Sequence, residues 1–556
     1  MNKGTVIILL LIISFIGVFL FYPTFYVFKE ACWHDGTLSF SYFRSLMLNP
    51  ITRDAIVNSL LLASVTTLLT IILAVPLAYA SVRYRFPLKN LLSGLLLIPL
   101  VMPPFVGAVG MKQFLARFGS LNLLLMELGL ISSPVDWLGS ARFWGVTIVM
   151  ALHFYPIMYF NVSAALANID PSLEEAALNL GSSPARKFLR ITLPLLTPGL
   201  FAGAILIFIG AFTDLGTQLI FEYRRVVPVQ IFDRVTDIGT NPEGFALVVL
   251  VLFFTLFSFI FNKRLFGREG YQTLSKGGAR STEIEPPALI KISLTLFFTL
   301  VILLASLPHL SVILTSLREK WFMTILPESY TLKYYSEALG HKLTLPAIRN
   351  SIILSSLSTI ADVIVGLTVA WLLTRKKFRG AELLDAVVML PLAIPGIVLA
   401  FGYVASFADT PLNPRENPMP LLVIAYAMRR LPYMVRAAYV GFQQVSVTLE
   451  EAGMNLGSST IRVLYKITVP LIIANIIAGS IMAFAFAMLE VSDSLILAIK
   501  EQFYPLTKAI YQLLGRIEDG PCIASALGVW AMVFLALSLL TANALLGKRM
   551  GTLFRI

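Results

Sequence analysis

Long apolar runs constrain the fold of this chain more than any other feature. Residues 5–21 (TVIILLLIISFIGVFLF) and 59–80 approach or exceed the roughly 18–20 residues needed to cross a bilayer, and similar runs recur through all 556 residues. Only 13% of the residues are charged and 57% are apolar, whereas about 25% are charged in a typical soluble domain. The sequence therefore predicts an all-α polytopic membrane protein.

The apolar runs predict about twelve transmembrane helices. We place them near 5–28, 56–81, 91–110, 143–168, 196–220, 244–262, 290–316, 350–374, 384–406, 420–442, 469–494 and 522–546. The turn 375–383 holds four basic residues, whereas the loop 407–419 holds one, and cytoplasmic loops are the basic ones. This bias predicts a multi-pass protein with both termini in the cytoplasm. It also accounts for the net charge of +12 without nucleic acid.

The chain contains an internal repeat. NSLLLASVTT at Asn58 corresponds to NSIILSSLST at Asn350, an offset of 292, and the offset becomes 276 from Pro156 and Pro432 onward. Each half has six predicted spans, an even number, so both copies enter the membrane in the same orientation. We expect a parallel repeat, related by an axis along the membrane normal. The predicted units are residues 1–262 and 288–556, joined by a cytoplasmic connector at 263–287.

A polar, charged segment interrupts the apolar chain once in each half. Residues 174–195 read EEAALNLGSSPARKFLRITLPL and residues 450–471 read EEAGMNLGSSTIRVLYKITVPL, identical at 13 of 22 positions. We call these segments the first and second polar islands. A loop that only connected two spans would drift in sequence between the copies. We therefore interpret each island as a cytoplasmic surface for a partner that binds twice.

Local signals predict a helix–turn–helix in each island. Asp170 can cap the first helix, and Gly181 can end it in a left-handed conformation that other residues resist. Ser183 can then begin a second helix. Gly457 and Ser459 repeat this pattern in the second island.

Two acidic residues lie at equivalent places inside predicted spans. Asp214 and Glu490 are related by the 276 offset, as are Thr217 and Asp493. Because acidic residues in a membrane are costly, they are candidates for a translocation path. The alternative is that they hydrogen-bond to interfacial backbone.

Three arginines interrupt the span 420–442. Arg429, Arg430 and Arg436 could pair with the acids, line the path, or mark a helix break at Pro432. The sequence indicates no metal-ligand set. Its two cysteines, Cys32 and Cys522, lie on the predicted outer side, where either a disulfide or free thiols are compatible with the sequence.

The islands carry a resemblance to a known family. EAALNLG from Glu175 and EAGMNLG from Glu451 resemble the EAA loop of binding-protein-dependent ABC transporter permeases; Gly453 departs from the family's alanine. In that family the loop forms a coupling helix that docks on a cytoplasmic ATPase. The resemblance implies coupling residues Glu174, Glu175, Ala176, Ala177, Gly181, Arg186, Glu450, Glu451, Ala452, Gly453, Gly457 and Arg462.

The fusion of two permease units in one chain resembles the ferric-iron permeases most, and thiamine permeases share this layout. The resemblance implies partners: two cytoplasmic ABC ATPase subunits, which carry the ATP and Mg²⁺, and an extracellular or periplasmic substrate-binding protein. The chain has no G-x-x-x-x-G-K-[ST] motif, so we expect no ATPase activity of its own. The alternatives are import of thiamine or another small solute by the same mechanism, or an ion-coupled secondary transporter.

Overall fold

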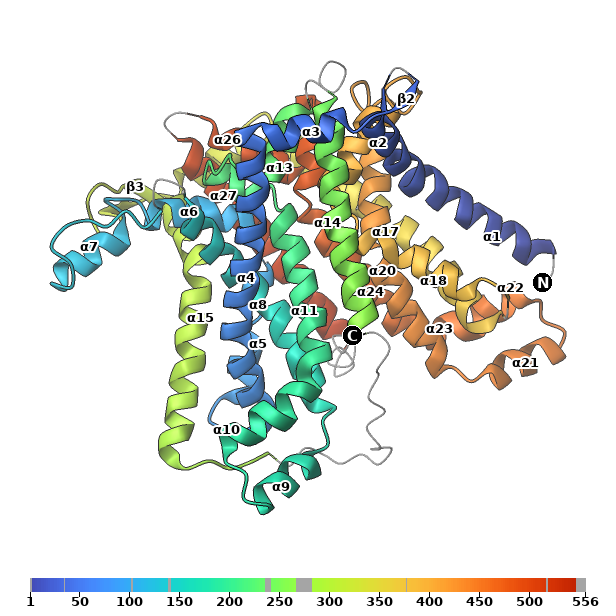
Figure 1. Cartoon of the computed structure of the whole chain (residues 1–556), viewed down its shortest axis with the longest axis horizontal. Coiled ribbons are helices and arrows are strands. Elements are labelled where there is room, and N and C mark those ends of the chain that lie inside the picture. Colours follow the sequence, from blue (N-terminus) through green and yellow to red (C-terminus); the bar gives the residue numbers. More distant parts are fainter. Residues whose placement is uncertain are drawn as a thin grey trace.

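The computed structural model describes residues 3–34, 36–101, 104–138, 142–235, 242–266, 283–376, 378–516 and 519–546. These residues form an almost entirely helical molecule, as predicted, with two arms that meet near the top of Figure 1 and diverge below. Most of the predicted connector lies outside the described residues. Ile284, near its end, hydrogen-bonds to the backbone of Arg83 and Arg85.

The first half contains fourteen α-helices and one hairpin among the described residues. They are α1 (Lys3–Ile16), α2 (Tyr22–Cys32), β1 (Trp33–His34), β2 (Thr37–Leu38), α3 (Ser41–Leu48), α4 (Pro50–Arg83), α5 (Lys89–Leu95), α6 (Pro104–Phe114), α7 (Ser120–Glu127), α8 (Phe143–Ala167), α9 (Pro171–Asn179), α10 (Pro184–Lys187), α11 (Leu193–Thr213), α12 (Gly216–Ile220), α13 (Val227–Arg234) and α14 (Glu243–Phe266).

The second half repeats much of this order in the described part of the chain. Its elements are α15 (Ala288–Leu317), β3 (Arg318–Lys320), β4 (Ser329–Tyr330), α16 (Lys333–Gly340), α17 (Thr344–Arg375), α18 (Ala381–Met389), α19 (Gly396–Ser406), α20 (Met419–Gln444), α21 (Val447–Asn455), α22 (Thr460–Val463), α23 (Val469–Leu471), α24 (Ile473–Met488), α25 (Ser492–Leu497), α26 (Leu506–Leu514) and α27 (Gly520–Leu546). Both hairpins, β1–β2 and β3–β4, are antiparallel.

Short 3₁₀ and π-helical turns join several of these helices. The 3₁₀ turns are Ile98–Val101, Leu390–Leu392 and Glu501–Phe503, and the π turns are Gly17–Phe21, Phe188–Thr192 and Leu464–Thr468. The last two π turns are related by the 276 offset and follow the islands. Each half packs around an equivalent trio of helices: α4, α8 and α11 in the first, and α17, α20 and α24 in the second.

Eight described helices are long and apolar enough to cross a membrane, and eleven spans result if each of three bent helix pairs counts as one. The remaining predicted span, 420–442, is the continuous helix α20, whose three arginines keep it from qualifying by composition. Pro432 lies inside this helix, so the predicted break is not observed.

Two of the bent pairs occupy equivalent places in the repeat. The chain turns by 96° between Leu100 and Phe105 and by 95° between Leu392 and Gly396. Both turns fall in the proline-rich stretches IPLVMPP and LPLAIPG. Proline removes a backbone donor and clashes with the preceding turn, which explains why the helices break there.

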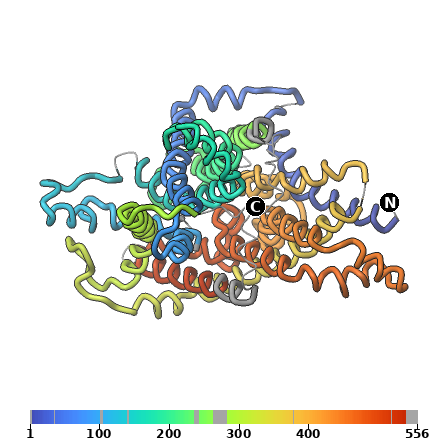
Figure 2. Tube along the Cα trace, turned by 90° about the horizontal axis from the view of Figure 1, so that it is seen from below, coloured from blue at the N-terminus to red at the C-terminus, as the bar shows by residue number. Residues whose placement is uncertain are grey.

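The first membrane helices of the two halves are exchanged. Helix α2 packs against α19 of the second half, and α15 packs against α6 of the first half. Figures 1 and 2 both place the N-terminal helices beside the second half and α15 beside the first. Tyr403 donates a hydrogen bond to the Phe19 carbonyl at 2.7 Å. The two units are therefore interlocked rather than separate bundles.

Equivalent glycines permit both of these helix crossings. A Cβ atom at Gly110 would lie 2.5 Å from the backbone nitrogen of Val312 on α15, and one at Gly402 would lie 3.1 Å from Cβ of Pro23 on α2. The first distance is incompatible with any side chain unless the backbone moves. Glycine at Gly110 therefore sets how closely α6 and α15 approach.

We predict that Gly110→Ala destabilises the protein by about 1–3 kcal/mol, the usual range for overpacking a tight contact. The change would be measured as a lower thermal unfolding midpoint of the detergent-purified chain. Gly94→Ala is the control, because nothing lies within 4 Å of a Cβ at that position. Equal midpoints for the two variants would contradict the close crossing.

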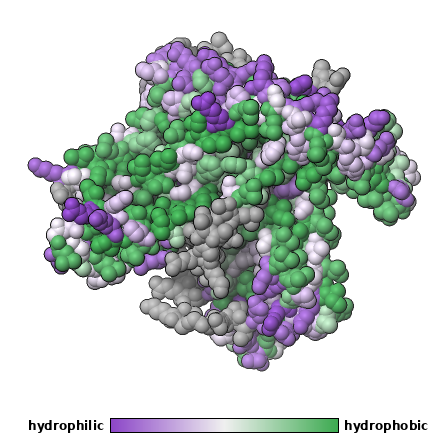
Figure 3. Space-filling view, turned by 180° about the vertical axis from the view of Figure 1, so that it is seen from behind, coloured by the Kyte–Doolittle hydropathy of each residue, from purple (hydrophilic) through white to green (hydrophobic). Residues whose placement is uncertain are grey.

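The surface agrees with a membrane protein. Figure 3 shows a broad apolar belt, with polar residues gathered at the top and at the lower end of the molecule. Large apolar side chains such as Leu296 and Leu300 on α15 and Ile364 on α17 are exposed. A lipid environment removes the cost of exposing them.

Candidate functional site

Each polar island folds as the predicted helix–turn–helix. The Asp170 side chain accepts a hydrogen bond from the Ser172 backbone at 2.9 Å and caps α9, which ends before Gly181 at a φ of +80°. Ser183 then caps α10 through the Arg186 backbone at 3.3 Å. The left-handed φ explains the glycine, since other residues adopt it at a cost.

The second island repeats this geometry. Helix α21 is capped by Ser446, Gly457 has a φ of +83°, and Ser459 caps α22 through the Arg462 backbone at 3.4 Å. Both islands lie on the lower side of Figure 1, toward the far ends of different arms. We call this side the island end and the side carrying α13 and α26 the opposite end.

A buried ion pair holds the first island to its own half. Glu174 lies 3.0 Å from Nε of Arg83, the last residue of α4, and accepts a 2.6 Å hydrogen bond from Thr192. Thr192 belongs to the π turn that follows α10. Arg83 and Glu174 are close enough to form an ion pair, but the guanidinium nitrogens of Arg83 form no well-aligned hydrogen bond to any described residue.

The same anchor is more completely bonded in the second half. Arg375, at the end of α17, donates from Nε to both carboxylate oxygens of Glu450 at 3.0 Å. Its Nη2 donates to the carbonyls of Phe442 and Val445 at 2.9 Å each. Thr468 also donates to Glu450 at 3.0 Å. Each island is thus locked to the end of a long membrane helix.

The opposite face of each island helix is exposed and apolar. Leu173, Ala176 and Leu180 follow helical spacing on α9, and Leu449, Ala452 and Leu456 occupy the equivalent positions on α21. Leu180 and Leu456 are both 87% exposed. An exposed apolar stripe on a helix is typical of a surface that lies in a partner's groove.

The structure divides the predicted coupling residues into two groups. The exposed group comprises Glu175, Ala176, Gly181, Arg186, Glu451, Ala452, Gly457 and Arg462, and the buried group comprises Glu174, Ala177, Glu450 and Gly453. The buried group faces the chain itself, and the coupling roles of all twelve residues stay predictions. At Gly453, where the family has alanine, a Cβ would lie 2.7 Å from Cδ1 of Ile467.

The paired acidic residues begin short helices where the two halves meet. Asp214 accepts a 2.9 Å hydrogen bond from the Thr217 backbone, and Glu490 accepts one of 3.3 Å from the Asp493 backbone. A Cβ at Gly216 would lie 3.0 Å from a methyl group of Val491. Both acids therefore accept backbone hydrogen bonds, and their segments face each other.

The second half adds an ion-pair cluster that has no counterpart among the described residues of the first half. Arg429 lies 2.8 Å from Glu490 and 3.6 Å from Asp493, and Arg430 also pairs with Glu490. Of the three sequence interpretations for these arginines, pairing with the acids is the one observed. At the place equivalent to Arg429, His153 instead hydrogen-bonds to the Pro99 carbonyl at 3.0 Å.

The remaining candidates have other roles. Arg436 pairs with Asp385 at 3.0 Å. Cys32 and Cys522 are both buried and free, so they form no disulfide with each other. No group of three or more His, Cys, Asp or Glu side chains among the described residues could hold a metal ion.

Glu490→Gln should destabilise the cluster strongly. The change leaves two arginines beside one remaining carboxylate, and removing one partner of a buried ion pair costs about 3–5 kcal/mol. Asp214→Asn is the matched control in the first half, where only a helix cap worth about 1 kcal/mol is weakened. Thermal unfolding in lipid nanodiscs would compare the two. Equal losses would show that the ion pairs contribute nothing beyond the cap.

These features define a class: a multi-pass membrane protein built of two like, interlocked units, each with an exposed helical docking element at the same end. The chain belongs to the family described as binding-protein-dependent transport system inner membrane component, whose pattern matches residues 67–268 and 362–551. It is thus a permease component of an ABC importer, which implies ATPase and substrate-binding protein partners, and it is not itself the catalytic subunit.

Relatives with both units resemble nearly the whole chain. It is 26% identical over 519 residues to the ferric transport system permease protein FbpB of Actinobacillus pleuropneumoniae, covering 92% of this chain and 74% of that protein. A putative ferric transport system permease protein FbpB 1 of Haemophilus influenzae is 27% identical, with 88% and 77% covered.

One-unit relatives match a single half. The molybdate/tungstate transport system permease protein WtpB of Pyrococcus furiosus is 30% identical over 34% of this chain and 73% of its own length. Among solved structures, a bacterial ABC transporter involved in the import of alginate aligns with 46% of this chain and 94% of that chain, at 21% identity and a TM-score of 0.37.

Proposed function

We propose that this chain is the transmembrane permease of an importer for ferric iron. The island end faces the cytoplasm, two ATPase subunits bind α9 and α21, and a substrate-binding protein docks at the opposite end. The observation that carries the ATPase assignment is the duplicated island, with matched exposed stripes and matched buried anchors. Two equivalent docking elements are what we expect for a chain that binds two ATPase subunits.

The two-unit relatives support iron as the cargo. The ferric permeases align with about nine-tenths of the chain, including both islands, whereas the molybdate permeases align with about one-third. Thiamine or another small solute carried by the same mechanism remains the alternative cargo.

The geometry supports a mechanism in which motion passes through the anchors. When ATP draws the two ATPase subunits together, each exposed stripe moves with its subunit. The Arg83–Glu174 and Arg375–Glu450 pairs transmit this motion to the ends of α4 and α17, because a buried ion pair resists separation. The two arms then turn about their contact near Gly216 and Val491, which opens the path at the opposite end.

Reconstituted uptake tests the proposal. The chain would be purified with the ATPase and binding protein encoded beside it, placed in liposomes, and supplied with radioactive ferric iron bound to that protein. We expect accumulation that requires ATP inside the vesicle and fails with ADP. Uptake driven by an ion gradient without ATP would indicate a secondary transporter. ATP-driven uptake of thiamine without uptake of iron would show that the cargo is thiamine rather than ferric iron.

A further inference from the structure

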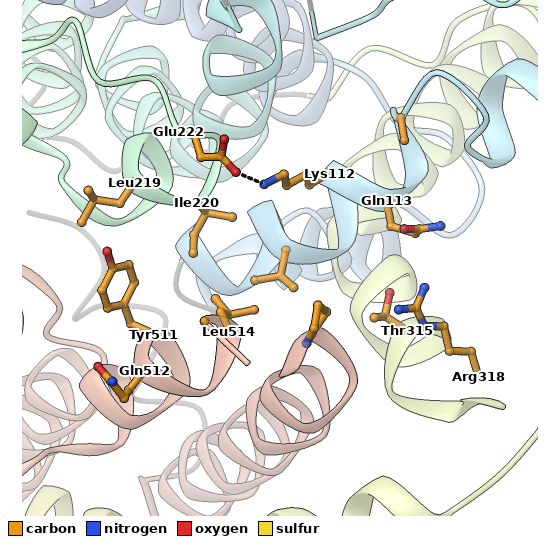
Figure 4. Close-up of a pocket in the computed structure, with 14 residues that line it drawn as sticks. Lys112, Gln113, Leu219, Ile220, Glu222, Thr315, Arg318, Tyr511, Gln512 and Leu514 are labelled. Carbon is orange, nitrogen blue, oxygen red and sulfur yellow. Dashed lines mark hydrogen bonds and ion pairs between the residues drawn. The ribbon is translucent and has the colours of Figure 1, made fainter. Parts of the chain in front are cut away.

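A cavity of about 540 Å³ lies between the two halves at the opposite end of the molecule. Its walls come from α6 and the residues around the end of α12 in the first half, and from the ends of α15, α26 and α27 in the second (Figure 4). This volume is within the range of about 300–1,000 Å³ that suits a small ligand. Its position at the junction places it at the mouth of the proposed path.

The one carboxylate among the described residues that line this cavity is already paired twice. Glu222 accepts hydrogen bonds of 2.7 Å from Lys112 and from Arg142, one at each oxygen. Figure 4 shows Lys112 and Glu222 meeting at the edge of the cavity. The hydrogen bond from Lys112 has the largest effect on the pKa of Glu222, and the one from Arg142 adds to it. Together they lower this pKa to about 2. The carboxylate is therefore charged at neutral pH and held by two cations.

A further cation has no acidic partner. Arg318, which lines the cavity where α15 ends, donates through Nε to Cys522 at 3.1 Å and forms no ion pair with any described residue. Its terminal nitrogens carry four more donors in a planar fork that matches carboxylate and phosphate oxygens. The Gln113 and Gln512 amides and the Tyr511 hydroxyl add neutral hydrogen-bonding groups to the lining.

The balance of charge decides what kind of ligand fits. Lys112 and Arg318 supply two positive charges to the described lining, and Glu222 supplies one negative charge. Arg142, which is not part of the described lining, adds a positive charge beside Glu222. A bare metal cation would meet a net positive lining, in which the one carboxylate among the described lining residues is already paired. An oxygen-bearing anion would gain charge-assisted hydrogen bonds from Arg318.

We propose that this cavity binds a small oxygen-bearing anion, either a free oxyanion or the anionic chelate of a metal, and that Arg318 is its principal contact. The inference rests on the proposed importer function and deepens it. Cargo released by the binding protein would enter the path together with its anion rather than as a bare ion.

Calorimetric titration of the full chain in nanodiscs tests this site. The probes are citrate, ferric citrate and molybdate, with magnesium chloride as the cation. We expect binding of at least one anion and none of Mg²⁺, and a Kd raised about tenfold or more in Arg318→Gln through loss of the charged fork. If ferric citrate binds more tightly than citrate and molybdate, the ligand is a metal chelate. If molybdate binds most tightly, the ligand is a free oxyanion.

Two further variants keep the outcome interpretable. Lys320→Gln removes an exposed charge from the same hairpin and should bind as the unmodified chain does. If Arg318→Gln fails gel filtration, Lys112→Gln replaces it, because Arg142 still holds Glu222. Anion affinity unchanged in the cavity variant, or no anion binding at all, overturns the cavity site. The proposed function is tested separately by iron uptake. If the unmodified chain takes up iron when ATP is supplied, the proposed function holds even without the cavity site, and if it takes up no iron, the proposed function is overturned.

Discussion

Glu450→Gln is expected to uncouple ATP hydrolysis from transport. The substitution leaves Arg375, whose side chain is 9% exposed, facing a neutral group, and removal of one partner from a largely buried pair costs about 3–5 kcal/mol. That loss falls on the contact between the second island and α17 rather than on the membrane core. We expect faster hydrogen exchange in α21 and a sharp fall in cargo uptake per ATP hydrolysed by the reconstituted complex.

The matched control lies one residue along the same helix. Glu451 is on the exposed face, so Glu451→Gln should leave hydrogen exchange of α21 in the isolated chain unchanged. The first half offers a graded comparison: Glu174→Gln should cost less, because Arg83 makes no aligned hydrogen bonds among the described residues. If α21 in Glu450→Gln exchanges as slowly as in the control, the anchor does not hold the island.

Leu180→Asp combined with Leu456→Asp is expected to abolish binding of the ATPase subunits. Burying one leucine is worth about 1.5–3 kcal/mol, so each single change should weaken its own contact by roughly 10- to 100-fold. Because the two contacts are linked through one chain, the double change should also remove the gain from bivalency. Biolayer interferometry of the permease against purified ATPase subunits would measure this.

Leu130→Asp provides the control for the added charge. Leu130 is also largely exposed, but it follows α7, at a distance from both islands. This variant should bind the ATPase like the unmodified chain. Normal ATPase affinity in the double island variant would exclude the apolar stripes as the docking surface.

Much of the local structure was predictable from the sequence. Asp170, Gly181 and Ser183 each play the expected part at a helix end, because capping and left-handed turns depend on adjacent residues. The 292 offset of the repeat also relates Gly110 to Gly402, which lie at equivalent helix crossings. Helix ends and repeated positions can be predicted from adjacent residues or from the repeat itself, without knowing which distant residues they contact.

The orientation of individual side chains was less predictable. Glu174 and Glu175 are adjacent and chemically alike, yet one is buried against Arg83 and the other is exposed. The 292 offset of the repeat relates Arg83 to Arg375, and this recurrence of an arginine at the end of equivalent helices is the signal that could have identified the anchors. For Arg429 and Arg430, the sequence left three interpretations, and only packing of α20 beside the Glu490 segment selected one.

The sequence by itself determined that the chain is a helical membrane protein with two like units and two islands. Hydrophobic length, repeat spacing and helix caps are properties of neighbouring residues, and they survive without a tertiary structure. The tertiary structure alone decided that the first helices are exchanged between the units, that each island is anchored by one face and exposed by the other, and that a cationic cavity lies at their junction. These features depend on contacts between residues up to hundreds of positions apart, which no local pattern encodes.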